Sequence, residues 1–98
     1  MFGKLFKKTD YKALLDNGAI IVDVREPREY AGGAIPGSEN IPLGTLGSKV
    51  TALKNKNVSI ICVCASGVRS GVASAKLKAA GIDSYNGGGW TKMIPYVG

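Results

Sequence analysis

Two short apolar segments constrain the fold of this chain more than any other feature. Residues 19–24 read AIIVDV and residues 58–63 read VSIICV. Both are rich in β-branched residues and neither alternates apolar with polar positions, which is typical of strands that are buried on both faces. Because segments of helical character follow these strands, the sequence predicts an α/β fold of three layers, with a mainly parallel central sheet flanked by helices.

The N-terminal half predicts only short helical segments around the first strand. Thr9 and Asp10 are candidate N-caps for a helix that Gly18 ends in a left-handed conformation. Residues 26–30 predict a helical turn with Pro27 near its start, where the missing N–H costs nothing. Residues 31–47 carry five glycines and two prolines, Pro36 among them, and are expected to be largely irregular.

The C-terminal half predicts a longer helix and a third strand. Residues 46–53 form a weak helix candidate, and the helix after the second strand is expected to end at Gly81, with Ala73 and Leu77 on its buried face. Residues 83–86 predict a short strand. Residues 87–89, all glycine, predict a tight turn, and Trp90 opens a final helical segment.

Length and composition indicate one globular domain spanning residues 1–98, with residues 1–8 as a basic lead-in. The chain is 45% hydrophobic and 20% charged, which argues against disorder. No apolar run approaches the ~18 residues of a membrane span. The first residues are basic but lack the apolar core of a signal peptide, so we expect a cytoplasmic protein without membrane contact.

The net charge of +6 favours anionic substrates or an acidic protein partner. The lysines are dispersed, apart from a small cluster at Lys4, Lys7, Lys8 and Lys12. No basic stripe interleaved with aromatic residues is present, so nucleic acid is not an expected partner. The sequence shows no obvious exposed apolar stripe and therefore predicts a monomer.

The chain contains no histidine, which excludes histidine-based metal sites, Ser-His or Cys-His pairs and imidazole acid–base catalysis. Its two cysteines are one residue apart and do not close a useful disulfide loop. We therefore expect no metal and no cofactor. Any nucleophile has to be activated by other means.

Cys64 is the candidate nucleophile, because it is expected at the carboxyl end of a buried strand, where open parallel sheets bind ligands. No proline follows before residue 70, so every backbone N–H from Ala65 to Ser70 is available as a donor, and Gly67 permits a tight bend. Amides gathered at a helix N-terminus stabilise an anion and lower the pKa of a thiol. The predicted binding residues are Ala65, Ser66, Gly67, Val68, Arg69 and Ser70.

Arg69 is unusual for its place, because a cation in the first turn of a helix opposes the helix dipole. It is explained if a bound anion or a thiolate faces it, and its forked guanidinium suits sulfonate or phosphate oxygens. The other explanation is a surface ion pair with Glu26 or Glu29. Cys62 is expected to be a buried apolar residue on the same face of the strand as Cys64.

Three segments together resemble the single-domain rhodaneses, a sulfurtransferase family, from about Asp10 to Trp90. They are residues 21–30 (IVDVREPREY), residues 33–42 (GAIPGSENIP) and residues 64–70 (CASGVRS), with GGGW at residues 87–90. The resemblance implies that Cys64 attacks the sulfane sulfur of a donor such as thiosulfate, carries it as a persulfide and passes it to cyanide or a thiol. It also implies that the amides of residues 65–70 hold the persulfide and that Arg69 steadies the loop or the donor anion. Asp23 and Arg25 match the first motif of the family, as a supporting structural pair.

The chain departs from the family pattern at one position. Many rhodaneses have histidine before Ile-Pro-Gly, where this chain has Ala34, so the polar contact of that histidine is not expected here.

Two alternative functions are considered. The first is a Cys-Arg phosphatase or arsenate reductase, which shares the anion cradle but places five residues between cysteine and arginine, where this chain has four. The other alternative is a rhodanese-like module that binds a partner without turnover.

Overall fold

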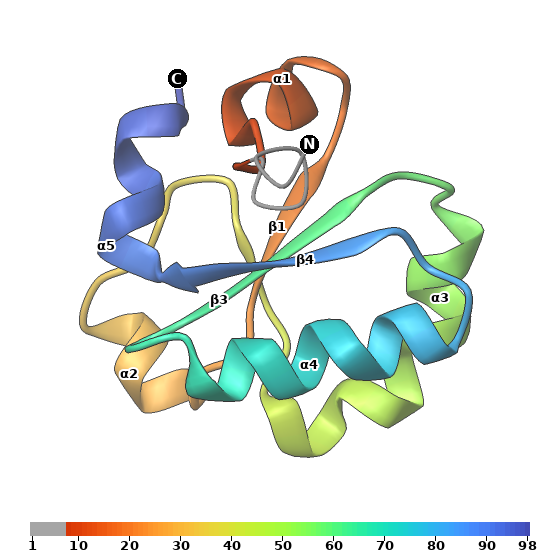
Figure 1. Cartoon of the computed structure of the whole chain (residues 1–98). Coiled ribbons are helices and arrows are strands. Elements are labelled where there is room, and N and C mark those ends of the chain that lie inside the picture. The colour runs from red at the N-terminus through yellow and green to blue at the C-terminus, as the bar shows by residue number, and fades with distance from the viewer. Residues whose placement is uncertain (1–7) are drawn as a thin grey trace.

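The computed structural model describes residues 8–98, so most of the basic lead-in, residues 1–7, lies outside the described residues. A four-stranded sheet forms its centre (Figure 1). The strands are β1 (Ile20–Asp23), β2 (Glu39–Asn40), β3 (Ile60–Cys64) and β4 (Ser84–Gly89). Their order is β2-β1-β3-β4 and every neighbouring pair is parallel. The predicted α/β fold with a parallel sheet is therefore confirmed.

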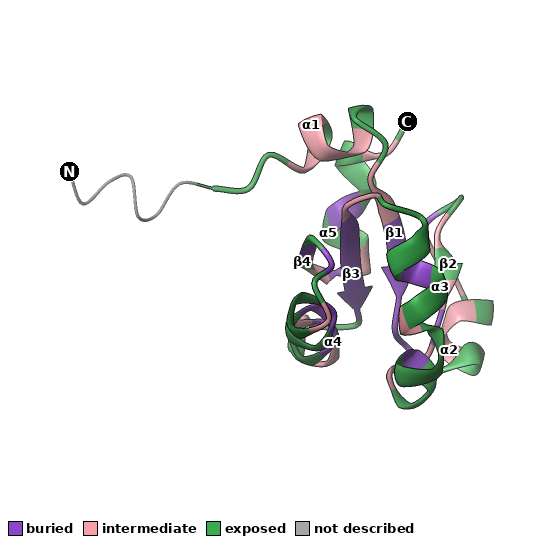
Figure 2. Cartoon of the chain, turned by 90° about the vertical axis from the view of Figure 1, so that its right-hand side faces the viewer, coloured by how far each residue is buried: buried purple, intermediate pink, exposed green. Residues whose placement is uncertain are grey.

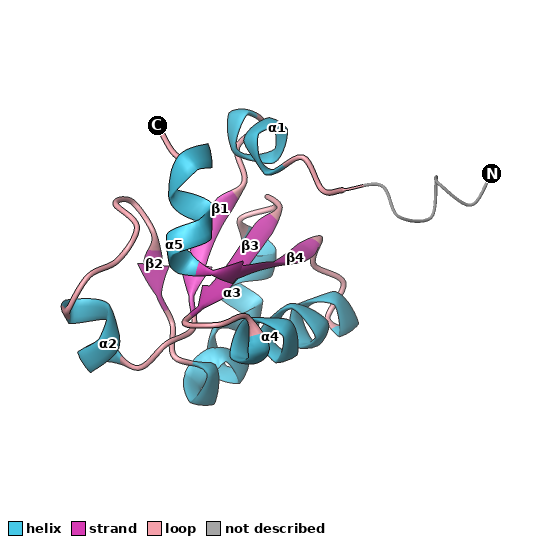
Figure 3. Ribbon diagram, turned by 60° about the vertical axis from the view of Figure 1, so that its left-hand side comes forward, coloured by secondary structure: helices cyan, strands magenta, loops and turns pink. Residues whose placement is uncertain are grey.

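Helices cover both faces of this sheet (Figure 3). The α-helices are α1 (Tyr11–Asp16), α2 (Pro27–Ala31), α3 (Val50–Asn55), α4 (Val68–Ala79) and α5 (Trp90–Met93). Two 3-10 segments, Leu43–Lys49 and Ile94–Tyr96, precede α3 and follow α5. No helix within residues 8–98 has the length and apolar character needed to cross a membrane.

The core has two parts, one on each side of the sheet. On the side of α3 and α4, Leu53 and Leu77 pack with Val22 and Cys62. On the side of α1 and α5, Met93 packs with strand residues that include Ile61, while α1 adds partly buried side chains. Figure 2 shows the mostly buried strands β1 and β3 between these helical layers. β1 and β3 are thus covered on both faces, as their unbroken apolar runs predict.

Local signals explain where several elements begin and end. The carboxylate of Asp10 caps α1 by accepting from the N–H of Ala13, and Gly18 follows with a φ of 99°. α2 begins at Pro27 behind a capping box in which Glu26 and Glu29 each accept a backbone N–H of the other. These caps satisfy N–H groups that have no partner inside the helix.

The structure corrects the interpretation of the glycine run. Residues 87–89 do not form a tight turn but continue β4, where Gly88 and Gly89 pair with Val63 and Cys64 of β3. The register shifts at this point, because Cys62 pairs with Asn86 while Val63 already pairs with Gly88. A bulge of this kind bends a strand and re-aims its side chains.

Candidate active site

The sulfur of Cys64 lies at the carboxyl end of β3, where the chain turns into α4. Two backbone N–H groups point at it, from Gly67 at 3.0 Å and from Ser70 at 3.3 Å between nitrogen and Sγ. The hydroxyl of Ser70 is 3.3 Å from the same sulfur. The two N–H groups form a cradle around one atom, at the start of a helix whose dipole also favours negative charge.

Gly67 gives the loop its shape. Its φ of 103° is in the left-handed region, and a Cβ at this position would lie 3.3 Å from Cα of Gly88 on β4. A side chain would therefore be strained by its backbone conformation and crowded by the neighbouring strand. This tight bend brings the N–H of residue 67 back onto the sulfur three residues earlier.

Asn86 on β4 anchors this loop, although it was not among the site residues predicted from the sequence. Its Nδ2 donates to the carbonyl of Gly67 at 3.0 Å, and its Oδ1 accepts from the hydroxyl of Ser70 at 2.6 Å and from the N–H of Gly88 at 2.9 Å. Three bonds to separate parts of the chain fix the orientation of the amide. The only signal in the sequence is an asparagine, a residue disfavoured in strands, directly before three glycines.

The glycines of β4 allow the strand to approach this loop and the core closely. A Cβ on Gly89 would lie 2.9 Å from the carbonyl oxygen of Ala65, and one on Gly87 would lie 2.7 Å from the Ile61 side chain and 2.8 Å from that of Met93. Contacts this short are not compatible with a side chain unless the neighbours move. The run therefore holds β4 against the cysteine loop.

The two cysteines have opposite environments although they lie on one strand. Burial disfavours the thiolate of Cys64, but its contacts with the Ser70 hydroxyl and with the amides of Ser70, Gly67 and Ser66 outweigh this effect, so the pKa of Cys64 is lowered. Burial raises the pKa of Cys62 to about 12, with a smaller contribution from the nearby Cys64. Of the two cysteines, Cys64 is therefore the one whose surroundings favour the reactive thiolate.

We expect alkylation of Cys64 to report this difference directly. In a Cys62→Ser variant, the rate of reaction with iodoacetamide should rise with pH and level off with a midpoint below the ~8.5 of a free cysteine, because the thiolate is the reactive form. The measurement is the pH profile of the modification rate by mass spectrometry, with the unfolded variant as control. A midpoint equal to that of the unfolded chain would contradict the cradle.

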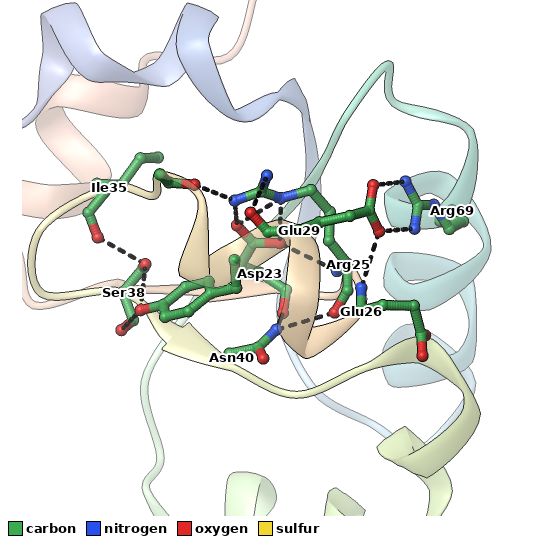
Figure 4. Close-up of polar contacts among 10 residues, drawn as sticks. Asp23, Arg25, Glu26, Glu29, Ile35, Ser38, Asn40 and Arg69 are labelled. Atoms are coloured by element: carbon green, nitrogen blue, oxygen red, sulfur yellow. Dashed lines mark hydrogen bonds and ion pairs between the residues drawn. The ribbon is translucent and has the colours of Figure 1, made fainter.

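Asp23 and Arg25 form a buried ion pair at the end of β1, beside the cysteine strand (Figure 4). Arg25 Nη2 lies 2.8 Å from Asp23 Oδ2 and 2.7 Å from the carbonyl of Gly33, and its guanidinium is 4.7 Å from the centre of the Trp90 ring. Asn40 on β2 donates to the carbonyls of both paired residues. This pair joins three segments and leaves neither charge free.

Arg69 extends from the first turn of α4 to Glu29 on α2 (Figure 4). The contact is bidentate, with Nη1 2.6 Å from Oε1 and Nη2 3.0 Å from Oε2. Hydrogen bonds from Arg69 and from the Glu26 amide lower the pKa of Glu29 to about 2. Of the two explanations for Arg69, the structure therefore shows the ion pair, while a contact with a donor anion stays a prediction.

The predicted site residues fall into two groups in the structure. Ser66, Gly67 and Ser70 meet at the sulfur of Cys64. Ala65 and Val68 are exposed, and the side chain of Arg69 faces Glu29. Among the hydrogen bonds of residues 8–98, the backbone N–H groups of these three residues do not donate to the sulfur. Within the same residues, no cluster of three or more Cys, Asp or Glu is suited to a metal ion.

This combination of fold and site defines a class: parallel α/β domains in which a cysteine ends a central strand and the next loop wraps around its sulfur. A profile of the rhodanese-like domain matches residues 7–93. The chain belongs to the rhodanese-like domain family.

Known proteins similar to this chain agree with that placement. "Putative sulfur carrier protein YrkF" of Bacillus subtilis is 41% identical over 66 residues, which are 67% of this chain and 35% of that protein. A rhodanese-like domain protein of Staphylococcus aureus is 35% identical, with a TM-score of 0.70 over 94% of this chain and 81% of its own. An E. coli rhodanese solved with anions is 31% identical, with a TM-score of 0.70 over 76% of this chain and 91% of its own. The chain matches about a third of the length of the YrkF protein.

Proposed function

We propose that this chain is a sulfurtransferase that carries a sulfane sulfur on Cys64 as a persulfide. The observation that carries the proposal is the cradle, in which backbone N–H groups of Gly67 and Ser70 donate to Cys64 Sγ and lower its pKa. The same donors are suited to hold the negative charge of a persulfide. Family membership and the similarity to a protein named as a sulfur carrier support a role in sulfur transfer.

The proposed reaction has two displacement steps and no external oxidant. The Cys64 thiolate attacks the outer sulfur of a donor such as thiosulfate, the sulfur–sulfur bond of the donor breaks, and sulfite leaves with the electron pair. Cyanide or a thiolate then attacks the outer sulfur of the persulfide. The new sulfur–sulfur bond breaks and Cys64 is released as a thiolate, ready for another cycle.

Steady-state kinetics test this two-step scheme. Because the donor product leaves before the acceptor reacts, thiocyanate formation from thiosulfate and cyanide should give parallel lines in double-reciprocal plots at several fixed cyanide concentrations. Intersecting lines would contradict a free persulfide intermediate. The absence of turnover, with no sulfur bound to Cys64, would favour the alternative of a binding module.

The geometry gives less support to phosphatase or arsenate reductase activity. In such enzymes the loop arginine has to meet a tetrahedral oxyanion, whereas Arg69 here is held in a bidentate ion pair with Glu29. Hydrolysis of p-nitrophenyl phosphate is therefore expected to be absent. We further propose that the chain works in the cytoplasm, since its nucleophile is a free thiol that a reducing compartment preserves.

A further inference from the structure

The outward face of α4 is apolar, which is unusual for a surface helix. Its exposed residues at positions i, i+4, i+7 and i+11 are Val68, Val72, Ala75 and Ala79, which we call the outer stripe. Val68 is 73% exposed and Val72 is 45% exposed. The opposite face of the helix, with Ala73 and Leu77, is buried in the core. The expectation that the chain has no exposed apolar stripe was therefore wrong.

The outer stripe begins at the cysteine loop. Val68 is the first residue of α4 and directly follows Gly67, whose N–H contacts the sulfur of Cys64. Cys64 itself is 1% exposed. A molecule that exchanges sulfur with Cys64 has to reach this loop, and the stripe continues from the loop along the helix.

Among residues 8–98, unpaired lysines border the stripe, whereas the two arginines near the cysteine loop are paired. Lys76 and Lys78 lie on either side of the stripe in the last turn of α4, and neither forms an ion pair within residues 8–98. By contrast, Arg25 and Arg69 near the cysteine are both paired with carboxylates. The two arginines are therefore not free to bind a small anion, whereas the two lysines of α4 are free to face carboxylates of a partner.

We propose that the outer stripe and its two lysines dock an acidic protein segment that carries the thiol exchanging sulfur with Cys64. The inference rests on the proposed function and names its partner class. Apolar residues of the partner would cover Val72 and the alanines, and its carboxylates would face Lys76 and Lys78. A second copy of this chain is disfavoured as occupant, because each copy carries a net charge of +6.

The transfer itself balances without a further reactant. The partner's thiolate attacks the outer sulfur of the Cys64 persulfide, the sulfur–sulfur bond at Cys64 breaks, and the electron pair of that bond leaves on the Cys64 thiolate. The partner then holds the persulfide. Sulfur also moves in the opposite direction when the partner arrives loaded.

The test uses two synthetic peptides as acceptors. Each has one cysteine beside leucines, and they are identical except that the glutamates of one are lysines in the other. After loading the protein with thiosulfate, sulfur should pass to the acidic peptide about tenfold faster than to the basic one at low salt, and high salt should reduce the difference. Equal rates for the two peptides would overturn the proposal.

Matched variants locate the effect on α4. Lys76→Gln with Lys78→Gln should lower the preference for the acidic peptide about threefold or more, whereas Lys54→Gln with Lys56→Gln, which removes the same charge at the end of α3, should not. Val72→Gln should slow transfer to the acidic peptide, whereas Ile94→Gln, at a side chain also 45% exposed, should not. Equal effects of test and control variants would overturn the assignment to this face.

Three further outcomes distinguish the docking proposal from the proposed function and from a homodimer. If the protein takes up no sulfur, or if cyanide does not remove it, the proposed function fails before docking is tested. If loading and discharge to cyanide are normal but peptide discrimination is absent, only the docking proposal fails. Self-association that is lost in Val72→Gln would assign the stripe to a homodimer and would also overturn the proposal.

Discussion

Replacing Cys64 by serine is expected to lower thiocyanate formation by at least ~10³-fold while leaving the fold intact. The hydroxyl is similar in size to the thiol and accepts the same N–H groups of Gly67 and Ser70, so the loop keeps its hydrogen bonds. It does not ionise near neutral pH and forms no persulfide. The measurements are initial rates and circular dichroism of wild type and variant.

Cys62→Ser is the matched control for this prediction. Cys62 is buried in the same part of the core as Cys64, and its pKa of about 12 keeps it a thiol at neutral pH. A hydroxyl in this apolar site should cost about 1–3 kcal/mol of stability, yet the rate per folded molecule should stay close to that of wild type. An equal loss of activity in both variants would instead indicate chemistry that involves both cysteines.

Replacing Arg25 by methionine is expected to destabilise the fold by about 3–5 kcal/mol. The change leaves Asp23, which is completely buried, without its cation, and it also removes the bond to the carbonyl of Gly33 and the contact with Trp90. A buried carboxylate that has lost its cation is costly, because the charge stays out of water without compensation. Urea denaturation of wild type and variant measures the effect.

Arg69→Met provides the comparison, because it breaks an ion pair that is partly exposed. The side chains of Arg69 and Glu29 are 35% and 37% exposed, and pairs of this kind contribute about 0–1 kcal/mol. The two arginines should therefore differ several-fold in their effect on the free energy of unfolding. Similar values for both variants would show that burial does not decide the strength of these pairs.

The sequence predicts the parts of the fold that depend on local patterns. β1 and β3 are recognisable in the sequence because strands buried on both faces do not alternate apolar with polar residues. The predicted position of Cys64, at the carboxyl end of the second buried strand, agrees with the bounds of β3. The cap at Asp10 and the stop at Gly18 mark α1 by residue type alone. Each of these signals acts over a few residues and does not require knowledge of the partners in space.

The parts that were missed depend on contacts between distant segments. The three glycines of residues 87–89 predict a turn, yet Gly87 belongs to β4, where its missing side chain makes room for Ile61 and Met93. Asn86 is separated from its loop partners Gly67 and Ser70 by at least 16 residues, and no local pattern links them. The choice of Glu29 over Glu26 as the partner of Arg69 likewise depends on where α2 meets α4.

Intact-mass spectrometry detects a persulfide on Cys64 without any assumption about the acceptor. The protein is weighed before and after incubation with thiosulfate, and again after cyanide is added, with Cys64→Ala treated in parallel. We expect a gain of one sulfur atom that cyanide removes and that the variant does not show. A gain of the same mass in Cys64→Ala, or no gain in the wild type with any sulfane sulfur donor, would contradict a persulfide on Cys64.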